Sequence, residues 1–193
     1  MKKIMFNDKY GLTEAVLAKR KTQTRRIIPS VDYKNRRYEG VSKLTNPDGT
    51  KSVLAQFSDK RVLSAYAINE VVAIAQAYKN IPKFPQLSKQ AVEELKQSPG
   101  WNNKMFVKAD LMPHRIRITN VRVEHLQDIS AEDCLKEGIK RKNERYCVEN
   151  YKGVCFYTND PILAFRCLID KTCGKGTWDS NPWVFVYDFE LIK

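Results

Sequence analysis

Two long segments with alternating apolar residues constrain the fold most. Between Phe106 and Glu124, isoleucine and valine alternate with arginine and glutamate, and Trp183 to Ile192 also alternates. A period of two places successive side chains on opposite faces of a strand. The parity slips near Thr119 and Asn120, which predicts a β-bulge. Because each of these strands has an apolar face that needs a covering layer, we expect a core built on a sheet.

Shorter segments supply the other expected elements. The apolar run Val71 to Ala75 predicts a strand buried on both faces, at the centre of the sheet. Short strands are expected at Lys2 to Phe6 and Ser52 to Phe57, and a charged loop at Lys140 to Gly153. Helices are predicted at Thr13 to Ala18 with Thr13 as N-cap, Ser88 to Gln97, Ser130 to Glu137 and Pro161 to Thr172. These elements predict an α+β chain whose strands form a small mixed β-barrel with short flanking helices.

Length and composition bound the class of protein. At 193 residues, of which 42% are hydrophobic, the chain suits one core, so we expect a single domain over residues 1–193. The formal charge of +12 favours a polyanionic partner, RNA or DNA before an acidic membrane surface. No apolar run approaches a bilayer span and no signal peptide is apparent, so a cytoplasmic protein is expected. Five cysteines without a CxxC pair, with two histidines, argue against a zinc site, and no cofactor is implied.

The basic stretch Lys19 to Arg26 is the strongest functional signal. It holds five cations and two threonines within eight residues. Its period is that of an extended chain, so the odd-numbered residues from Lys21 to Arg25 should face one way and the even-numbered residues from Thr22 to Arg26 the other. The alternative is a solvated basic loop. Because the stretch is too polar for a core, replacing Lys21 or Thr24 is expected to cost about 1 kcal/mol of stability or less.

The basic stretch also carries a family resemblance. Leu17-Ala18-Lys19-Arg20-Lys21-Thr22-Gln23-Thr24-Arg25-Arg26 resembles the pattern Leu-x-Gly-Arg-Lys-Thr-x-Thr-x-Arg of the ASCH family, which is similar in fold to the PUA domains of RNA-modifying enzymes. The strand around Val71 to Ile74 and the segment Val121 to Gly138 also resemble the family. The ending Gly174 to Trp183 is similar to a larger, phage-associated branch. The resemblance implies a PUA-like domain with insertions at residues 32–60, 80–103 and 140–160.

The resemblance implies specific roles. Some small ASCH proteins are amidohydrolases that remove acetyl from N(4)-acetylcytidine, and their catalytic residues match Lys21, Thr24 and Glu137 here. A threonine hydroxyl becomes a nucleophile when a lysine with a depressed pKa takes its proton, and neighbouring cations are expected to lower the pKa of Lys21. Glu137 would protonate the departing amine or position the substrate. In the alternative, Lys21 binds phosphate and Thr24 bonds to backbone.

Three positions depart from the family pattern. Lys19 stands where the family has glycine. Ile68-Asn69-Glu70 replaces a Pro-Gly-Asp turn, and Ala75-Gln76 replaces an Arg-Glu pair. If that pair lines the cleft in relatives, its loss weakens the case for the same substrate.

Two functions are therefore kept open. The first is an RNA-binding or nucleotide-binding module with a cationic cleft, in which Tyr78, Trp101 and Trp178 are candidates for base stacking. The second is an amidohydrolase acting on acylated nucleosides in the same cleft. A module should bind oligonucleotides better than nucleosides, whereas an enzyme should turn over a nucleoside. A third function, acting on host components through protein contacts, rests only on the phage-associated resemblance. The candidate nucleic-acid-binding residues are Lys19, Arg20, Arg25, Arg26, Arg115, Arg117 and Arg122.

Overall fold

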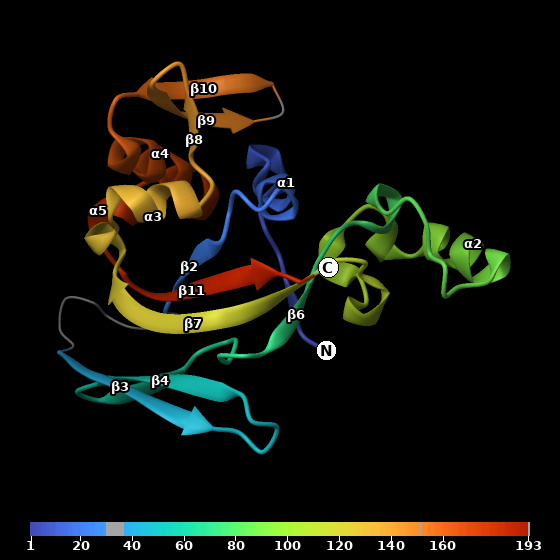
Figure 1. Cartoon of the computed structure of the whole chain (residues 1–193), viewed down its shortest axis with the longest axis horizontal. Helices are drawn as coiled ribbons and strands as arrows, with labels where there is room; N and C mark the ends of the chain where they lie inside the picture. The colour runs from blue at the N-terminus through green and yellow to red at the C-terminus, as the bar shows by residue number, and fades with distance from the viewer. Residues whose placement is uncertain (30–36, 151, 193) are drawn as a thin grey trace.

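The largest sheet organises the molecule. The structure is a computed structural model that describes residues 1–29, 37–150 and 152–192 of an α+β fold (Figure 1). The five-stranded sheet has the order β1-β6-β7-β11-β2, with β1 parallel to β6 and the other neighbours antiparallel. Its strands are β1 (Lys3–Ile4), β6 (Val71–Ile74), β7 (Arg115–His125), β11 (Trp183–Leu191) and β2 (Gln23–Ile27).

The two alternating segments are β7 and β11, which pair at the middle of this sheet. Asp188 lies opposite Asn120 and Phe189 opposite Ile118, so Thr119 is the extra residue of a bulge and the predicted bulge is confirmed. The strand is shorter than predicted, because Phe106 ends the 3₁₀ turn η4 (Lys104–Phe106) and η5 (Ala109–Leu111) follows.

The prediction that Val71 to Ala75 is the central strand is wrong. Strand β6 lies between β1 and β7, one place from the edge. It is nevertheless buried on both faces: Val72 and Ile74 belong to one apolar cluster, and Ala73 and Ala75 to another. Burial of both faces therefore reports the layers above and below the strand, and not its place in the sheet.

Two smaller sheets add further layers (Figure 1). In the order β3-β4-β5, the first packs Val53, Ala55 and Phe57 of β4 against the five-stranded sheet. In the order β10-β9-β8, the second lies over helix α4. No sheet in the described part of the chain closes into a barrel, so the predicted barrel is not found. The strands are β3 (Tyr38–Thr45), β4 (Lys51–Phe57), β5 (Lys60–Leu63), β8 (Lys140–Lys142), β9 (Arg145–Asn150) and β10 (Gly153–Thr158).

The charged segment predicted as a loop forms most of the second small sheet. Glu149 of β9 bonds Lys140 at 2.5 Å and also bonds Lys142, so its charges pair across the ladder. Val148 of β9 is buried against α4. The high charge density that suggested a loop therefore stabilises strand pairing.

The helices follow their capping signals with one exception. Ser88 and Ser130 each accept a hydrogen bond from the first turn of their helices, as predicted, and Asp160 does the same before Pro161, the predicted first residue of its helix. The first helix is instead capped by Gly11, and Thr13 lies inside it. Helix α2 projects away from the layers and covers no part of the site (Figure 1). The helices are α1 (Leu12–Leu17), α2 (Lys89–Gln97), α3 (Ala131–Lys136), α4 (Pro161–Cys173) and α5 (Thr177–Ser180).

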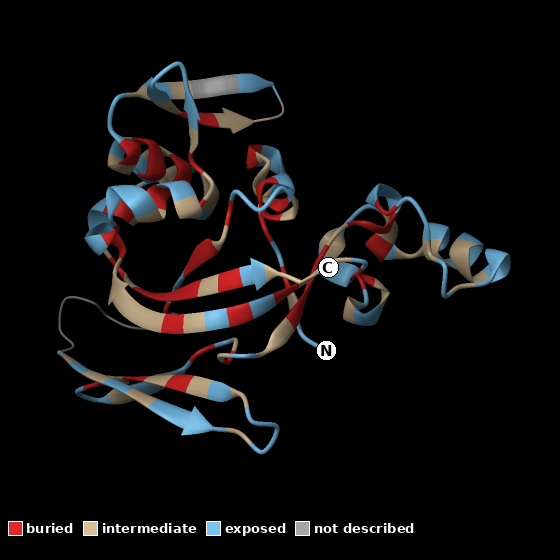
Figure 2. Ribbon diagram, in the orientation of Figure 1, coloured by how far each residue is buried: buried red, intermediate tan, exposed pale blue. Residues whose placement is uncertain are grey.

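The core forms on both faces of the five-stranded sheet (Figure 2). One face contributes Phe185 and Tyr187 to the cluster shared with β4, and the other contributes Val184 and Val186 to the cluster shared with α3 and α4. None of the helices in the described ranges has the length and apolar character needed to cross a membrane.

Candidate functional site

Lys21 is a buried cation at the start of the site. Its side chain is 2% exposed, and Nζ donates to the main-chain oxygens of Gln23 at 2.7 Å and Glu137 at 2.8 Å. A third bond joins Nζ to Glu137 Oε2 at 2.6 Å. Three acceptors match the three donors of an ammonium group, so these contacts fit charged Lys21 paired with Glu137.

The end of helix α3 brings Glu137 to Lys21. Glu137 is the C-cap, and the main-chain N–H of Thr22 donates to the oxygen of Lys136 at 2.9 Å, which ties the start of β2 to this helix end. Lys21 then satisfies the Glu137 carbonyl, which has no partner inside the helix. Gly138 follows with a φ of +102°, and a Cβ there would lie 3.5 Å from Cβ of Lys21. The helix dipole alone would disfavour a carboxylate here, and the ammonium of Lys21 compensates.

Arg25 and Arg122 extend these contacts into a charge network. Arg25 Nη2 bonds Glu124 Oε1 at 2.6 Å, and Nη1 bonds Glu137 Oε1 at 3.1 Å. Arg122 bonds Asp133 at 2.6 Å and Asp188 at 2.9 Å. These three cations and four carboxylates have a net charge of −1, so the whole positive charge of the chain, +12 overall, comes from residues outside them. We define the charge network as Lys21, Arg25, Arg122, Glu124, Asp133, Glu137 and Asp188.

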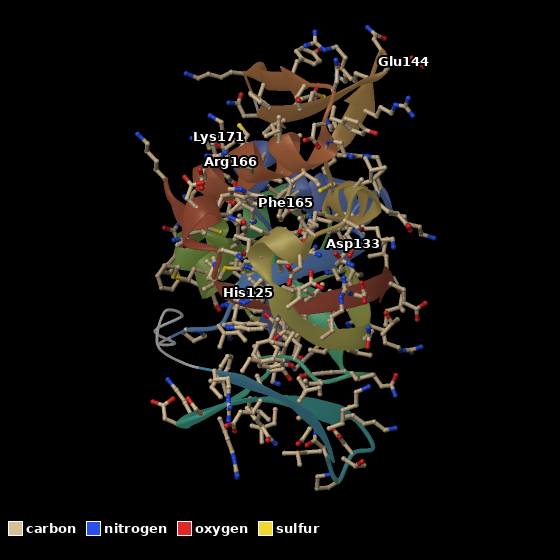
Figure 3. The ribbon with its side chains drawn as sticks, turned by 90° about the vertical axis from the view of Figure 1, so that its left-hand side faces the viewer. His125, Asp133, Glu144, Phe165, Arg166 and Lys171 are labelled. Atoms are coloured by element: carbon tan, nitrogen blue, oxygen red, sulfur yellow. The ribbon has the colours of Figure 1, made fainter. Side chains whose placement is uncertain are left out.

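A cavity of about 260 Å³ lies beside β2, which is an edge strand of the sheet. Lys21, Thr24 and Glu137 all line it, so the three predicted catalytic residues come together. In Figure 3, Phe165 and Asp133 lie in the middle of the molecule, whereas Glu144 lies at its upper rim. The remaining lining residues are Met5, Phe6, Asn7, Leu12, Arg25, Arg26, Phe165, Leu168, Ile169, Thr172 and Cys173.

Thr24 differs from its neighbours in having no side-chain partner. It is 5% exposed, and its hydroxyl makes no hydrogen bond to any residue that the structure describes. Its main chain pairs with Tyr187, on the face opposite Arg25, which pairs with Val186. The predicted division into two sides is therefore confirmed for Gln23 to Arg26, the part of the predicted segment that lies in β2. The backbone bond predicted for the Thr24 hydroxyl in the alternative reading is not found among these residues.

Burial is the largest cause of the lowered pKa of Lys21. The charge and hydrogen bond of Glu137 act in the opposite direction, and the charges of Arg26 and Arg25 lower the pKa further. The predicted direction is therefore confirmed, but its predicted main cause is wrong. Lys19 and Arg20, which were expected to contribute, are exposed and do not line the cavity.

The candidate nucleic-acid-binding cations are dispersed. Because of the bulge, Arg115, Arg117 and Arg122 lie on one face of β7. Arg122 is paired with Asp133 of helix α3, and Arg117 lies 3.5 Å from Glu190. None of these three lines the cavity, and the Arg25 side chain, at 1% exposed, is committed to carboxylates. Only Arg26 joins the cavity as an exposed cation among its described lining residues. The prediction of one cleft walled by all these cations is wrong.

The aromatic residues proposed for stacking are mostly core. Tyr78 is 2% exposed and its hydroxyl accepts from the N–H of Lys108, while Trp178 packs against Phe165. Trp101 packs against the apolar cluster that contains Tyr78 and Met112. The aromatic cavity residues are instead Phe6 and Phe165, which no sequence motif identified.

No metal site is evident at this location. In the residues that the structure describes, no group of three or more histidine, cysteine, aspartate or glutamate side chains could hold a metal ion. The buried acids of the charge network are bonded to arginine and lysine instead. Burial raises the pKa of the Cys134 thiol to about 12, which keeps it protonated and unreactive.

Comparison with known proteins adds no relative, since no family model, no curated protein and no solved structure matches this chain.

Proposed function

We propose that the cavity is the active site of an amidohydrolase that removes an acyl group from the amine of a nucleoside such as N(4)-acetylcytidine. The observation that carries this proposal is that Lys21, Thr24 and Glu137 line one cavity in which the Thr24 hydroxyl has no partner among the described residues. The ASCH-like motif, with the PUA-like fold it implies, adds support from the sequence.

The cavity size favours a small ligand. Its volume of about 260 Å³ lies just below the range of about 300–1,000 Å³ that is common for ligand pockets. The apolar walls include Phe6 and Phe165, which suit a flat base. A nucleoside matches this space better than a strand of nucleotides does.

The buried pair of Lys21 and Glu137 provides the proton relay. In the relay, one proton first moves from Lys21 to Glu137 and gives an amine and a carboxylic acid; burial lowers the pKa of Lys21 and so favours its uncharged amine. Thr24 then attacks the acyl carbon and gives its proton to the amine of Lys21. Glu137 protonates the departing nucleoside amine, leaving an acyl ester on Thr24 and the pair as ammonium and carboxylate.

Water completes the cycle. Glu137 takes a proton from the water that attacks the ester, and Lys21 returns a proton to the oxygen of Thr24 as the ester bond breaks. The products are the free amine and the carboxylic acid, and the pair is again an amine and a carboxylic acid. Each proton taken in one step is returned in the other, so no external co-reactant besides water is needed.

A main-chain donor is available for the developing oxyanion. The bonds from Phe189 N to Thr22 O and from Ile28 N to Trp183 O show that even-numbered residues of this segment bond to β11. The N–H of Arg25 therefore points to the open edge, the side on which Lys21 reaches the oxygen of Gln23. A preorganised N–H next to the nucleophile is typical of sites that stabilise a tetrahedral intermediate.

Acetyl release from N(4)-acetylcytidine tests the proposal. Thr24→Ala and Glu137→Gln should each lower kcat/KM by about a thousandfold or more, since the residues act as one unit. Thr22→Ala is the matched control, because Thr22 is the neighbouring threonine and does not line the cavity. Equal losses in Thr22→Ala and Thr24→Ala, or no turnover by the wild type on any acylated nucleoside, would contradict the proposal.

A different observation supports RNA binding as a second candidate function. A separate groove of about 400 Å³ is lined by Arg20, Leu135, Ile139, Lys140, Arg141 and Lys142. Lys140 and Lys142 of this groove bond Glu149, whereas Arg20 bonds to no carboxylate in the described ranges, so Arg20 is the cation best placed to meet a phosphate backbone. RNA bound there would use Arg20, and not the buried cations of the charge network.

A further inference from the structure

Arg26 lines the cavity but stands outside the charge network. Its Nη2 donates to the main-chain oxygen of Met5, its side chain is exposed, and it forms no ion pair with any residue that the structure describes. A guanidinium carries five N–H donors. Within the described ranges, most of the Arg26 donors therefore remain for a ligand.

No carboxylate of the residues that the structure describes forms an ion pair with Arg26. Lys21 and Arg25 are neutralised by carboxylates, and Glu137 is the one acid among the described lining residues of the cavity. Arg26 also helps to lower the pKa of Lys21, so its charge is felt inside the cavity. Among the described residues, Lys21 and Glu137 therefore balance each other inside the cavity, and Arg26 is a cation without a paired carboxylate at its exposed side.

Asn7 supplies a second donor along the same wall. Its Oδ1 accepts from the N–H of Lys9 at 3.0 Å, which leaves its amide NH₂ group for another acceptor. Asn7 and Arg26 both line the cavity. A fork of guanidinium donors beside an amide suits an anion with several oxygens, such as a phosphate monoester.

We propose that Arg26, assisted by Asn7, selects a ligand that carries a phosphate monoester, so that the cavity takes a nucleoside monophosphate in preference to the neutral nucleoside. This inference rests on the proposed function for the place of the reacting amine beside Thr24. It assigns Arg26 to ligand specificity and leaves the chemical steps to the other lining residues.

Calorimetric binding of cytidine, cytidine 3′-monophosphate and cytidine 5′-monophosphate tests the inference. The wild type should bind at least one monophosphate about tenfold or more tightly than cytidine, because charge-assisted bidentate bonds are strong. Arg26→Gln should abolish that preference. Arg166→Gln is the matched control, since Arg166 is an exposed arginine of α4 that pairs with Asp179 at 3.0 Å and does not line the cavity. Figure 3 labels this control residue.

Three results would overturn the inference: equal affinity for cytidine and both monophosphates, a preference that survives in Arg26→Gln, or an equal loss in Arg166→Gln. Binding does not require turnover, so the two proposals can fail separately. If a monophosphate binds through Arg26 but the protein releases no acetyl group, the amidohydrolase proposal is contradicted and the inference stands. Efficient acetyl release, together with binding that neither a phosphate on the ligand nor Arg26→Gln changes, would contradict the inference and leave the amidohydrolase standing.

Discussion

The basic stretch contains two kinds of cation that the sequence does not distinguish. Lys21 and Arg25 are buried, and their partners Glu124, Asp133 and Glu137 come from about a hundred residues away. Lys19 and Arg20 are exposed and bond to no carboxylate in the described ranges. The first kind shapes a site and the second kind carries the net charge. Density of charge along a sequence therefore does not show where that charge acts.

The largest expected difference between the two kinds is in stability. Arg25→Ala leaves the carboxylates of the charge network without their central cation, and we expect the free energy of unfolding to fall by about 3–5 kcal/mol. Arg20→Ala should change it by about 0.5 kcal/mol or less. Urea unfolding of the two variants measures both values. Similar losses would remove the distinction between buried and exposed cations.

The same reasoning revises the expected cost of replacing Lys21. The sequence placed it on the surface, whereas its side chain is 2% exposed and bonded to Glu137. Its removal should therefore cost far more than the 1 kcal/mol or less expected of a surface residue. Thr24, whose hydroxyl has no partner among the described residues, keeps the smaller expected cost.

A smaller effect concerns the glycine behind Lys21. Gly138→Ala places a side chain at a φ of +102° and 3.4 Å from Leu12 Cδ2, and we expect a loss of about 1–3 kcal/mol. Gly153→Ala is the control, since its φ is +115° and a Cβ there meets nothing within 4 Å. Thermal melts compare stability, and acetyl release compares activity. Only Gly138→Ala should also impair activity, and equal behaviour would show that contact with Lys21 is unimportant.

Local patterns predicted most of the elements, because alternation, bulges and helix caps are properties of neighbouring residues. The bulge at Thr119 and the caps Ser88 and Ser130 are examples. The patterns failed where distant partners decide. Asp133 lies on a helix predicted from its cap, but nothing in the sequence pairs it with Arg122. The barrel failed for the same reason, since closure depends on which strand edges meet.

The site was predicted in part. The motif resemblance selected Lys21, Thr24 and Glu137, which the structure brings to one cavity. The cavity walls Phe6 and Phe165 lie on segments that carry no motif, and their role depends on how the segment after β1 and helix α4 meet beside β2. Asp188 offered a weak signal, because it and Glu190 are the two acids in a strand of mostly apolar residues.

The pH dependence of turnover tests the role of Lys21, one of the two buried cations. In the proposed relay, Lys21 and Glu137 share one proton, and turnover ends when that proton is lost. Because the folded pKa of Lys21 is lowered, kcat/KM should fall about tenfold per pH unit above a midpoint below the ordinary value of 10.5. Between that midpoint and 10.5 the unfolded state binds more protons, so the contribution of Lys21 to stability rises with pH. Circular dichroism over the same range separates lost activity from unfolding.

The smallest expected effect concerns the exposed cations. If RNA binds in the groove lined by Arg20 and Lys140 to Lys142, affinity should fall steeply with salt, because each phosphate contact releases condensed counterions. Arg20→Ala should then reduce the slope of log affinity against log salt by about one unit. Arg117→Ala is the control, since Arg117 is also exposed but lies outside the groove. Filter binding across a salt series measures the slopes. Equal slopes for the wild type and both variants, or no binding at low salt, would mean that the exposed cations near the basic stretch contact no phosphate, and the cavity would remain as the one proposed site of function.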